Sequence, residues 1–499
     1  MSATVRLLSA QLDPLRSAVL QQELPGVRTA FDAEAMRAYL QEALFGTANS
    51  DYTIDRCDLG QSVYAGDCCV LRYRLEVRHN ASGQTLQPLV TGRVFQDQGA
   101  CAGYLRDRLA PLAERMRGRE EIAPFATPVA MIEPLNMVVY VFPIDGELPV
   151  LVDVTDRERM REILSDTLPD ARANRLAIQD CRVELGHYGR QHRCVLRYYV
   201  DATTPGADTP QQMLIYGKIA ADNRGALAGP VIAALHERVL NGGAYQFDIP
   251  RSFGFRPDLQ LALFEAIPGV PQVAQLLKAR LRGEAATRAG TLSLEESMAA
   301  CAQIAAALHT SGIALGRRRT LEDELAGLRQ GFAIVQHISP DLGAQFLAWL
   351  EQAEAYAATS KPMSLCFSHG DFSYTQLIFE GMRSGLVDFD TVCQAEPALD
   401  LGQFLAYVRV AVLKGQKGLS PASAAMTEQL CAQFLHDYIT AAGEQLEDEE
   451  RLRLRVPVYE IISLLRLGLH SWQKLKGSRL EYVISILEER VSCLPQLSY

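Results

Sequence analysis

Residues 368–405 read SHGDFSYTQLIFEGMRSGLVDFDTVCQAEPALDLGQFL, and the fold that the sequence predicts depends on this stretch. Two short apolar runs, Gln376–Phe379 and Gly385–Val387, lie on either side of the turn-forming segment Glu380–Ser384. Apolar runs separated by a short segment with Gly and Ser are typical of two antiparallel strands joined by a turn. The stretch therefore predicts a β-hairpin.

Acidic residues lie at both ends of this hairpin. Asp371 precedes the first strand, while Asp388 and Asp390 close the second and alternate with Phe389, so both carboxylates are expected on one face. Like charges held close together raise each other's pKa unless a cation neutralises them, and Mg²⁺ binds one or two carboxylates together with water and phosphate oxygens. The cluster favours a magnesium site. For Asp388 or Asp390 taken alone, a solvated acid after a strand remains the alternative.

Four groups of residues in this stretch form an ordered set: His369-Gly370-Asp371, Gln376, Asp388-Phe389-Asp390 and Glu396–Leu401. The set resembles the aminoglycoside phosphotransferase and choline kinase family. That resemblance implies a protein-kinase-like fold and transfer of the γ-phosphoryl group of ATP to a hydroxyl group of a small molecule. The family pattern has Asn where this chain has Gln376, and Gly-Asp where it has Ala395-Glu396.

The resemblance also implies a role for individual residues. Asp371 would be the catalytic base, with His369 as a second catalytic residue, and Asp400 would be a structural acid that braces the catalytic loop. The implied metal ligands are Gln376, Asp388 and Asp390. Gln places its amide oxygen one methylene further out than Asn, which changes the geometry of one metal position.

The composition is that of an ordinary soluble protein. The chain has 499 residues, and its length favours about two to four domains. Hydrophobic residues make up 48% of the chain and charged residues 22%. The formal net charge of −10 does not favour a nucleic-acid partner. An acidic surface would suit a cationic substrate, but it is equally a common means of keeping a protein soluble.

The N-terminal segment Met1–Leu20 is interrupted by charged residues, so it does not resemble a signal peptide. No apolar stretch approaches the roughly 20 residues that span a bilayer. We therefore expect a cytoplasmic protein with no membrane partner. The 11 cysteines are scattered, and the adjacent pair Cys68-Cys69 lacks the Cys-x-x-Cys spacing, so we expect reduced thiols in the core.

One segment of the N-terminal half occurs twice. Cys69–Tyr73 reads CVLRY, and Cys194–Tyr198 repeats it at an offset of 125 residues. Four further matches lie at offsets of 124 to 126: Met36-Arg37 with Met160-Arg161, Leu59-Gly60 with Leu185-Gly186, Gly92-Arg93 with Gly217-Lys218, and Gly99-Ala100 with Gly225-Ala226. A nearly constant offset predicts a duplicated domain of about 120 residues.

Each copy shows the same order of predicted elements. A helix begins near Met36 or Met160, antiparallel strands and a second helix follow, and a last strand is expected at Met137–Phe142 or Leu259–Ala266. This order is expected of the small lobe of a kinase-like fold. We therefore predict an α+β, protein-kinase-like two-lobe fold whose small antiparallel-sheet N-lobe is present as two tandem copies. The predicted parts are a non-catalytic duplicate at residues 1–152, a nucleotide-binding lobe at residues 153–272 and a helical catalytic lobe at residues 273–499.

The C-terminal part is predicted to be mostly helical. A helix is expected at Leu276–Arg288, and Ser293–Glu296 is a capping box that opens another. His309 lies in the last turn of that helix, where a favourable interaction with the helix dipole is the preferred interpretation over a catalytic one. Arg317–Arg319 favours a basic surface loop, with a site for an anionic acceptor as the alternative. Further helices are predicted at Leu321–Val335, Leu342–Ala357, Leu399–Leu413, Ala422–Ala442, Val456–Leu475 and Leu480–Val491.

Phosphoryl transfer requires a loop over the phosphates, a lysine on a strand, metal-binding acids and a base. In the second copy, Gly186 and Gly189 lie in the turn Leu185–Arg190, where backbone N–H groups could approach phosphates, although two glycines in a turn need mean no more than a turn. Lys218 follows on a strand, with Glu237 as the candidate partner acid from the next helix. Phe264, Glu265 and Ala266 would form the hinge that pairs with adenine.

The first copy has Arg93 where the second has Lys218, and Tyr64-Ala65-Gly66 where the second has spaced glycines. Guanidinium and ammonium groups are not interchangeable at a phosphate site. We therefore interpret the first copy as a non-catalytic module with a docking, regulatory or substrate-covering role.

The leading hypothesis is an ATP- and Mg²⁺-dependent phosphotransferase acting on a small-molecule hydroxyl group, such as that of an aminoglycoside, an amino alcohol or a sugar-like compound. One alternative is a nucleotide-binding pseudokinase or scaffold that uses the duplicated lobe to bind a partner. Another is a metal-dependent phosphoesterase that uses the three aspartates, although the histidines expected of such an enzyme are missing from the cluster. The sequence identifies neither the acceptor nor the oligomeric state.

Overall fold

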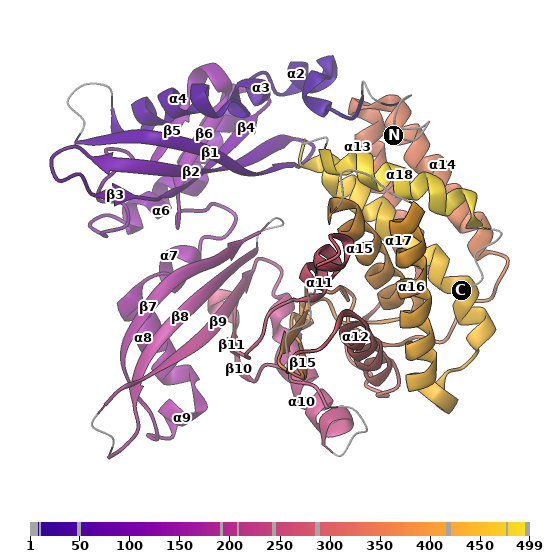
Figure 1. Ribbon diagram of the computed structural model, residues 1–499. Coiled ribbons are helices and arrows are strands. Elements are labelled where there is room, and N and C mark those ends of the chain that lie inside the picture. Colours follow the sequence, from indigo (N-terminus) through magenta and orange to yellow (C-terminus); the bar gives the residue numbers. More distant parts are fainter. Residues whose placement is uncertain are drawn as a thin grey trace.

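The computed structural model describes residues 8, 11–46, 51–189, 193–206, 209–241, 246–284, 290–415, 421–475 and 478–494. Three parts follow one another along the chain (Figure 1): two antiparallel sheets, each with its own helices, and a mostly helical region. We call them the first sheet module (residues 33–141), the second sheet module (residues 151–265) and the helical region (residues 273–492). Within the described residues, no helix is both long enough and apolar enough to cross a membrane.

The first sheet module begins with helix α4 (Ala33–Phe45), which Asp32 caps by accepting hydrogen bonds from the N–H groups of Glu34 and Ala35. Its sheet has the order β1-β2-β4-β6-β5, with β3 at the side of β2. The elements are β1 (Tyr52–Tyr64), β2 (Cys68–His79), β3 (Thr85–Leu86), β4 (Leu89–Phe95), α5 (Gln98–Tyr104), η3 (Leu105–Leu109), α6 (Ala110–Arg115), β5 (Val129–Ile132), η4 (Glu133–Leu135) and β6 (Met137–Val141).

The second sheet module has a five-stranded sheet of order β7-β8-β9-β11-β10. Strand β8 (Arg193–Thr203) alternates half-buried and buried side chains along its whole length, because one face of the sheet packs on helix α8 (Arg157–Thr167). The other elements are α7 (Leu151–Val154), α9 (Pro169–Arg172), β7 (Ala177–Tyr188), β9 (Gln211–Ala220), η5 (Arg224–Leu227), α10 (Ala228–Leu235), η6 (His236–Leu240), β10 (Ser252–Arg256), η7 (Pro257–Leu259) and β11 (Leu261–Glu265).

The two sheets correspond strand by strand. The irregularity between Leu59 and Gln61 in the pairing of β1 with β2 corresponds to the one between Leu185 and His187 in the pairing of β7 with β8. Arg93 pairs with Val70 in the first sheet, and Lys218 pairs with Val195 in the second. The shared order and register are those that a duplication predicts. Common descent and the three domain boundaries stay predictions.

The helical region contains the predicted hairpin. Strands β14 (Leu377–Glu380) and β15 (Arg383–Leu386) pair antiparallel, which confirms that prediction. Ser293 and Glu296 form the predicted capping box at the start of α12 (Leu294–His309). The remaining elements are α11 (Val273–Leu281), β12 (Arg317–Arg318), α13 (Leu321–Ile338), α14 (Pro340–Ala357), β13 (Cys366–Ser368), η8 (Phe389–Thr391), β16 (Cys393–Ala395), α15 (Ala398–Gly415), α16 (Pro421–Ala442), η9 (Gly443–Gln445), α17 (Glu449–Gln473) and α18 (Ser478–Ser492).

The first sheet module packs on the helical region (Figure 1), and it reaches the second sheet module through contacts of Arg72 with Tyr188 and Gly189. Its inner face and the helices share one continuous hydrophobic core, while the second sheet and α8 enclose a core of their own. Ser62 of β1 donates a hydrogen bond of 2.5 Å to the carbonyl oxygen of Lys474, directly after α17. Tyr64 lies edge-on to Trp472, with 5.8 Å between the ring centroids. Strand β1 and the C-terminal end of α17, which are far apart in sequence, are thus in direct contact.

The predicted α+β fold class is confirmed by these two antiparallel sheets and the helical region. The longer predicted helices lie where the periodicity placed them, and most differ from the prediction only at their ends. The prediction for Leu276–Arg288 differs more: α11 begins at Val273 and ends at Leu281, and residues 285–289 lie outside the described residues. All eleven cysteines are free thiols, and only Cys366 and Cys493 are partly exposed.

Candidate active site

The loop His369–Asp371 follows strand β13 and is held by one buried carboxylate. Asp400, in the first turn of α15, accepts hydrogen bonds from the backbone N–H groups of His369 (2.6 Å) and Gly370 (2.8 Å). Gly370 has φ 77°, and a Cβ atom there would lie 2.2 Å from the carbonyl oxygen of Thr391, so only glycine fits. Burial raises the pKa of Asp400, but its interactions with His309 and His369 together outweigh burial and lower that pKa below the usual 3.8. Asp400 therefore braces the loop as a carboxylate.

His309 supports this brace from behind. Its Nε2 lies 3.2 Å from Asp400 Oδ2, and its Nδ1 lies 2.9 Å from the hydroxyl oxygen of Tyr438. His309 lies in the last turn of α12, as predicted, and the interaction with the helix dipole stays a prediction; the structure adds that the imidazole is buried and engaged by specific partners. Periodicity within one helix gave no sign of contacts with α15 and α16.

Asp371, the predicted base, lies at the end of the braced loop. Its Oδ1 accepts a hydrogen bond of 2.5 Å from Gln403 Nε2, and its Oδ2 lies 3.4 Å from Gln376 Nε2. Burial, followed by the nearby charge of Asp388, raises the pKa of Asp371. The sequence motifs did not indicate Gln403, although it follows Asp400 by three residues and so lies on the same face of α15.

His369, the first residue of this loop, is fully buried. Its Nε2 lies 3.0 Å from the carbonyl oxygen of Val387, which joins the loop to the end of the hairpin. The hydroxyl group of Thr391 donates to the carbonyl oxygen of His369 at 3.1 Å. The geometry gives His369 a supporting position, and a catalytic role for it stays a prediction.

Asp388 and Asp390 lie next to each other, but not through the alternation along a strand that the sequence predicted. Strand β15 ends at Leu386, Asp388 has the left-handed φ of 74°, and Asp390 lies in the short helix η8. Both carboxylates nevertheless reach Lys218 of strand β9. The Nζ atom of Lys218 lies 2.6 Å from Asp388 Oδ1 and 3.5 Å from Asp390 Oδ2. A turn, rather than an extended strand, brings the two acids together.

The electrostatics of these three groups follow from their burial and pairing. Burial raises the pKa of Asp388, but the Lys218 ammonium outweighs burial and lowers that pKa to about 2. Burial is the main cause of the raised pKa of Asp390. The pKa of Lys218 is raised because the two carboxylates outweigh the effect of its burial. Lys218 and Asp388 are therefore both charged at neutral pH.

Glu237, the predicted partner of Lys218, does not make this ion pair. It is exposed on η6, and the structure pairs Lys218 with the two acids of the helical region instead. Helix α10 passes into the π-helical turn η6. The sequence indicated Glu237 as the partner of Lys218 only because it is the one carboxylate of that segment. Adjacency in sequence did not identify the partner.

The residues predicted to pair with adenine lie at the end of β11. The ring of Phe264 lies under Lys218, with 5.5 Å between its centroid and Nζ. The N–H of Glu265 donates to the carbonyl oxygen of Arg251 at 2.9 Å, and the N–H of Ala266 donates to that of Leu214 at 3.3 Å. Both N–H groups are thus engaged within the sheet. Pairing of this segment with adenine stays a prediction.

The prediction of a turn at Leu185–Arg190 is wrong for Leu185–Tyr188, because these residues belong to strand β7, and only Gly189 follows the end of that strand. Gly186 lies at the irregularity in the strand pairing, where a Cβ atom would be 3.1 Å from the carbonyl oxygen of Val195. Gly189 closes the strand end with a 2.9 Å hydrogen bond from its N–H to the carbonyl oxygen of Arg193. Arg190 lies outside the described residues.

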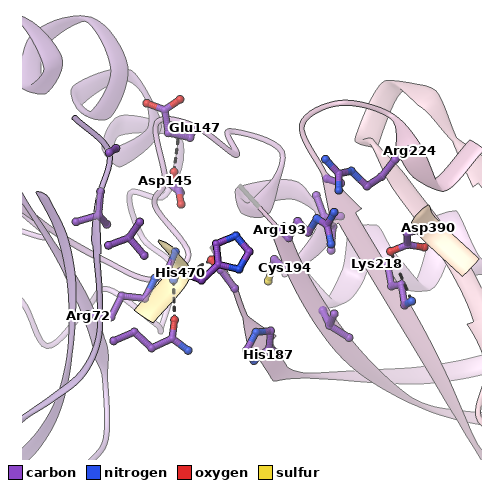
Figure 2. A pocket seen from close by; sticks show the side chains of 18 of the residues that line it. Arg72, Asp145, Glu147, His187, Arg193, Cys194, Lys218, Arg224, Asp390 and His470 are labelled. Atoms are coloured by element: carbon purple, nitrogen blue, oxygen red, sulfur yellow. Dashed lines mark hydrogen bonds and ion pairs between the residues drawn. The ribbon is translucent and has the colours of Figure 1, made fainter. Parts of the chain in front are cut away.

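These residues converge on one cavity of about 710 Å³, which all three parts of the chain line. Figure 2 shows Lys218, Arg193 and Asp390 on one side of it and Arg72 and Asp145 on the other. Of the predicted site residues, the cavity is lined by Gly189, Lys218, Asp371, Gln376, Asp388 and Asp390. A substrate-covering role was one of three roles that the sequence suggested for the first sheet module, but not its lining residues, which are Gln61–Ala65, Val70, Arg72, Arg93 and Tyr140.

The residues present fit a magnesium ion of the kind that nucleotides carry. Oδ1 of Asp390 is buried and makes no hydrogen bond within the described structure, and it lies beside Asp388 at the wall of the cavity. Across the described residues, no three His, Cys, Asp or Glu side chains form a complete metal cage. Mg²⁺ needs no such cage, because one or two carboxylates, water and phosphate oxygens complete its shell. Asp388, Asp390 and the amide oxygen of Gln376 are the residues that would hold it.

Comparison with protein families identifies the part of the chain that contains this site. Residues 238–455 match the model of the phosphotransferase enzyme family. The matched region includes the braced loop, the hairpin, Asp388, Asp390 and Asp400, which confirms the resemblance inferred from these motifs. No curated protein is significantly similar to the chain in sequence.

Among solved structures, the chain is similar to a choline kinase from Cryptosporidium parvum Iowa II, with 14% identity, 68% of this chain and 96% of that chain covered, and a TM-score of 0.44. It is also similar to a Plasmodium vivax ethanolamine kinase, with 13% identity, coverage of 68% and 88%, and a TM-score of 0.42. A GDP complex of an aminoglycoside 2'-phosphotransferase-IIIa shows 12% identity, coverage of 68% and 99%, and a TM-score of 0.42. Similarities this low bear on neither substrate nor mechanism.

Proposed function

We propose, because residues 238–455 match the phosphotransferase enzyme family, that this protein transfers the γ-phosphoryl group of ATP to a hydroxyl group of a small molecule in a Mg²⁺-dependent reaction. The observation that carries the proposal is one cavity with a braced, half-buried Asp371 on one wall and the Lys218–Asp388 pair on another. A base and a cation for phosphate are the two groups that phosphoryl transfer requires of the protein itself.

Asp371 accepts the proton of the acceptor hydroxyl group in this proposal. Its pKa is raised by burial and by the charge of Asp388, which makes its carboxylate a better proton acceptor than an exposed aspartate. Gln403 and Gln376 donate hydrogen bonds to its two oxygens and so orient them. Asp400 holds the backbone before it, so the carboxylate does not need to reorganise when substrate binds.

Lys218 binds a phosphate group of the nucleotide in this proposal. In the structure Lys218 pairs with Asp388. Nucleotide binding in this proposal breaks that ion pair and gives Lys218 and Asp388 each a new contact. The ammonium would then offset phosphate charge, and Asp388, Asp390 and Gln376 are the residues that would hold the nucleotide's cation. A Mg²⁺ ion in that position would screen the phosphate charges and align the γ-phosphoryl group.

The acceptor is proposed only as a class. The cavity is large enough for a small molecule beside nucleotide phosphates, because its 710 Å³ lies within the usual range of roughly 300–1,000 Å³ for ligand sites. Aminoglycosides, amino alcohols and sugar-like compounds remain the candidates. Arg319 already donates to the carbonyl oxygen of Gly370 (2.8 Å) and pairs with Glu324 (2.5 Å), so its guanidinium is engaged within the protein and is not proposed as an anchor for an anionic acceptor.

A nucleotide-binding pseudokinase is the second candidate, and one observation favours it. The amide nitrogen of Gln376 points to Asp371. In this arrangement the Gln376 amide orients the Asp371 carboxylate. A Mg²⁺ titration of Gln376 variants tests whether the same amide also completes a metal site. A pseudokinase would bind nucleotide with little turnover.

The experiment that tests the proposal measures binding first and turnover second. Thermal unfolding of the wild type and of Asp388→Asn is followed with ATP, with ATP and Mg²⁺, and with neither. ATP consumption by the wild type is then measured across a panel of hydroxyl compounds. We expect Mg²⁺-dependent stabilisation of the wild type and ATP consumption with at least one acceptor class. Stabilisation without consumption by any acceptor supports the pseudokinase, and no response to nucleotide overturns both proposals.

A further inference from the structure

The tip of the β7–β8 hairpin is held by the first sheet module, although it belongs to the second. Nη1 of Arg72, on strand β2, donates to the carbonyl oxygens of Tyr188 and Gly189, each at 2.9 Å. The guanidinium group also lies over the Tyr188 ring, with 3.7 Å between its central carbon and the ring centroid. Oε1 of Gln61, on strand β1, accepts from the same Nη1 at 3.1 Å and thereby orients the arginine.

Tyr188 anchors the same tip from a second direction. Its hydroxyl group donates a hydrogen bond to the carboxylate of Asp145, which is 4% exposed. The other oxygen of Asp145 accepts from the N–H groups of Glu147 (2.7 Å) and Leu148 (3.3 Å), so the carboxylate is itself fixed. Phe142 packs edge-on against the Tyr188 ring, with 5.5 Å between the centroids.

The corresponding arginine of the second sheet has a different partner. Arg197 is the residue that matches Arg72 in the repeated sequence CVLRY, and it pairs with Glu184 of its own hairpin at 3.3 Å. Arg93 matches Lys218 and does not reach the second sheet module either: it pairs at 2.6 Å with Glu147, a few residues after strand β6. Arg72 of the first sheet module therefore contacts the hairpin of the second sheet module, while Arg93 of the first module is engaged in a structural ion pair.

We infer that the first sheet module is a positioning element, built into the same chain, for the turn that covers the nucleotide phosphates, with Arg72 and Tyr188 as the positioning residues. The inference rests on the proposed function, because it assigns the phosphates to this cavity. A hairpin tip exposes carbonyl oxygens that repel phosphate, and the Arg72 guanidinium offsets the partial negative charge of two of them. Fixing the tip before binding also removes the entropy cost of ordering it when nucleotide arrives.

The test compares Arg72→Gln, Tyr188→Phe and the control Arg74→Gln. Arg74 lies two residues further along the same face of β2, is exposed, and makes no contact with the hairpin tip among those described. Hydrogen exchange of peptides covering residues 185–196 is measured without nucleotide, and KM for ATP and kcat are measured separately. Tyr188→Phe retains the ring and every charge in the cavity, so it tests the anchoring alone.

We expect Arg72→Gln to speed exchange in the hairpin and to raise KM for ATP by about 10- to 100-fold, the effect of losing charge-assisted hydrogen bonds. Tyr188→Phe is expected to show both effects to a smaller degree, and Arg74→Gln neither. Unchanged exchange in Arg72→Gln, even with a raised KM, overturns the inference and makes Arg72 a direct phosphate ligand. If the wild type transfers no phosphoryl group, the proposed function fails. The exchange measurement is independent of that result: faster exchange in Arg72→Gln shows that the first sheet module holds the hairpin, and unchanged exchange shows that it does not.

If Arg72→Gln does not fold, the two single variants Tyr188→Phe and Asp145→Asn are compared with the wild type instead. Neither of these substitutions removes a hydrophobic side chain. Faster exchange confined to residues 185–196 in either variant supports the inference, and wild-type exchange in both overturns it.

Discussion

The Nζ atom of Lys218 lies 2.6 Å from Oδ1 of Asp388, although the two residues are 170 positions apart. One belongs to a strand of the second sheet and the other to the turn after a hairpin in the helical region. The pair joins the two parts of the chain at the cavity and keeps both groups charged. We expect it to be the contact that nucleotide binding changes first.

Asp371 and Asp388 have different proposed roles, so their neutral isosteres should fail in different ways. Asp371→Asn should retain the affinity for ATP and Mg²⁺ and lower kcat by about 10²- to 10⁴-fold, as expected for loss of a general base. Asp388→Asn should instead weaken Mg²⁺-dependent nucleotide binding. Steady-state kinetics and nucleotide-dependent thermal unfolding distinguish the two variants. Wild-type turnover in Asp371→Asn would remove Asp371 from the mechanism.

Lys218 and Arg93 occupy matching positions in the two sheets and provide an internal control. Lys218→Met should weaken the use of ATP by about 10- to 100-fold, because a charge-assisted contact with phosphate contributes about 1.5–3 kcal/mol. Arg93→Met should leave KM for ATP unchanged and lower the unfolding temperature, because the 2.6 Å ion pair between Arg93 and Glu147 is lost. Calorimetry should find one ATP per chain. Equal loss of activity in both variants, or two bound ATP molecules, would contradict this division of roles.

Gln376 tests the departure from the family pattern. If its amide oxygen binds Mg²⁺, Gln376→Ala should raise the Mg²⁺ concentration required for half-maximal activity, and Gln376→Asn should retain part of the function. The measurement is a Mg²⁺ titration of activity at saturating ATP. A Gln376→Ala variant that matches the wild type at limiting Mg²⁺, but has a lower kcat, would assign Gln376 to orienting Asp371 instead, as its 3.4 Å contact with Oδ2 suggests.

Asp400 should contribute to stability as well as to activity. Asp400→Ala leaves the N–H groups of His369 and Gly370 buried without an acceptor, at a cost of about 1–3 kcal/mol for each group. The measurement is the free energy of unfolding by denaturant, together with kcat. A loss of activity without any loss of stability would argue against a brace.

The same carboxylate predicts a pH dependence. The pKa of Asp400 in the folded protein is lower than its usual 3.8, so its charge stabilises the fold fully above pH 3.8. That stabilisation is lost as the pH falls through the lowered pKa of the folded protein. The difference in unfolding free energy between the wild type and Asp400→Asn should therefore be constant near neutral pH and shrink in acid. A difference that does not change with pH would show that the charge of Asp400 is not the source of its effect.

The sequence by itself determined the local elements and the order of the chemical groups. The hairpin, the capping box at Ser293 and the long helices follow from apolar periodicity and turn residues, which act over a few neighbouring positions. The repeated CVLRY segment likewise predicted two comparable modules. Asp371, Gln376 and Asp388 were predicted as a set because their spacing along the chain resembles a family pattern, and the structure places all three at one cavity.

Only the tertiary structure decided which distant groups meet. The partner of Lys218 is Asp388 rather than Glu237, His309 supports Asp400 rather than merely ending a helix, and Arg72 reaches the hairpin of the other module. None of these contacts has a local signal, because a side chain's partner across two modules depends on how their faces pack. Neighbouring groups also set the charges: burial raises the pKa of both Asp371 and Asp400, but the pKa stays raised only at Asp371, beside Asp388, and is lowered at Asp400 by His309 and His369.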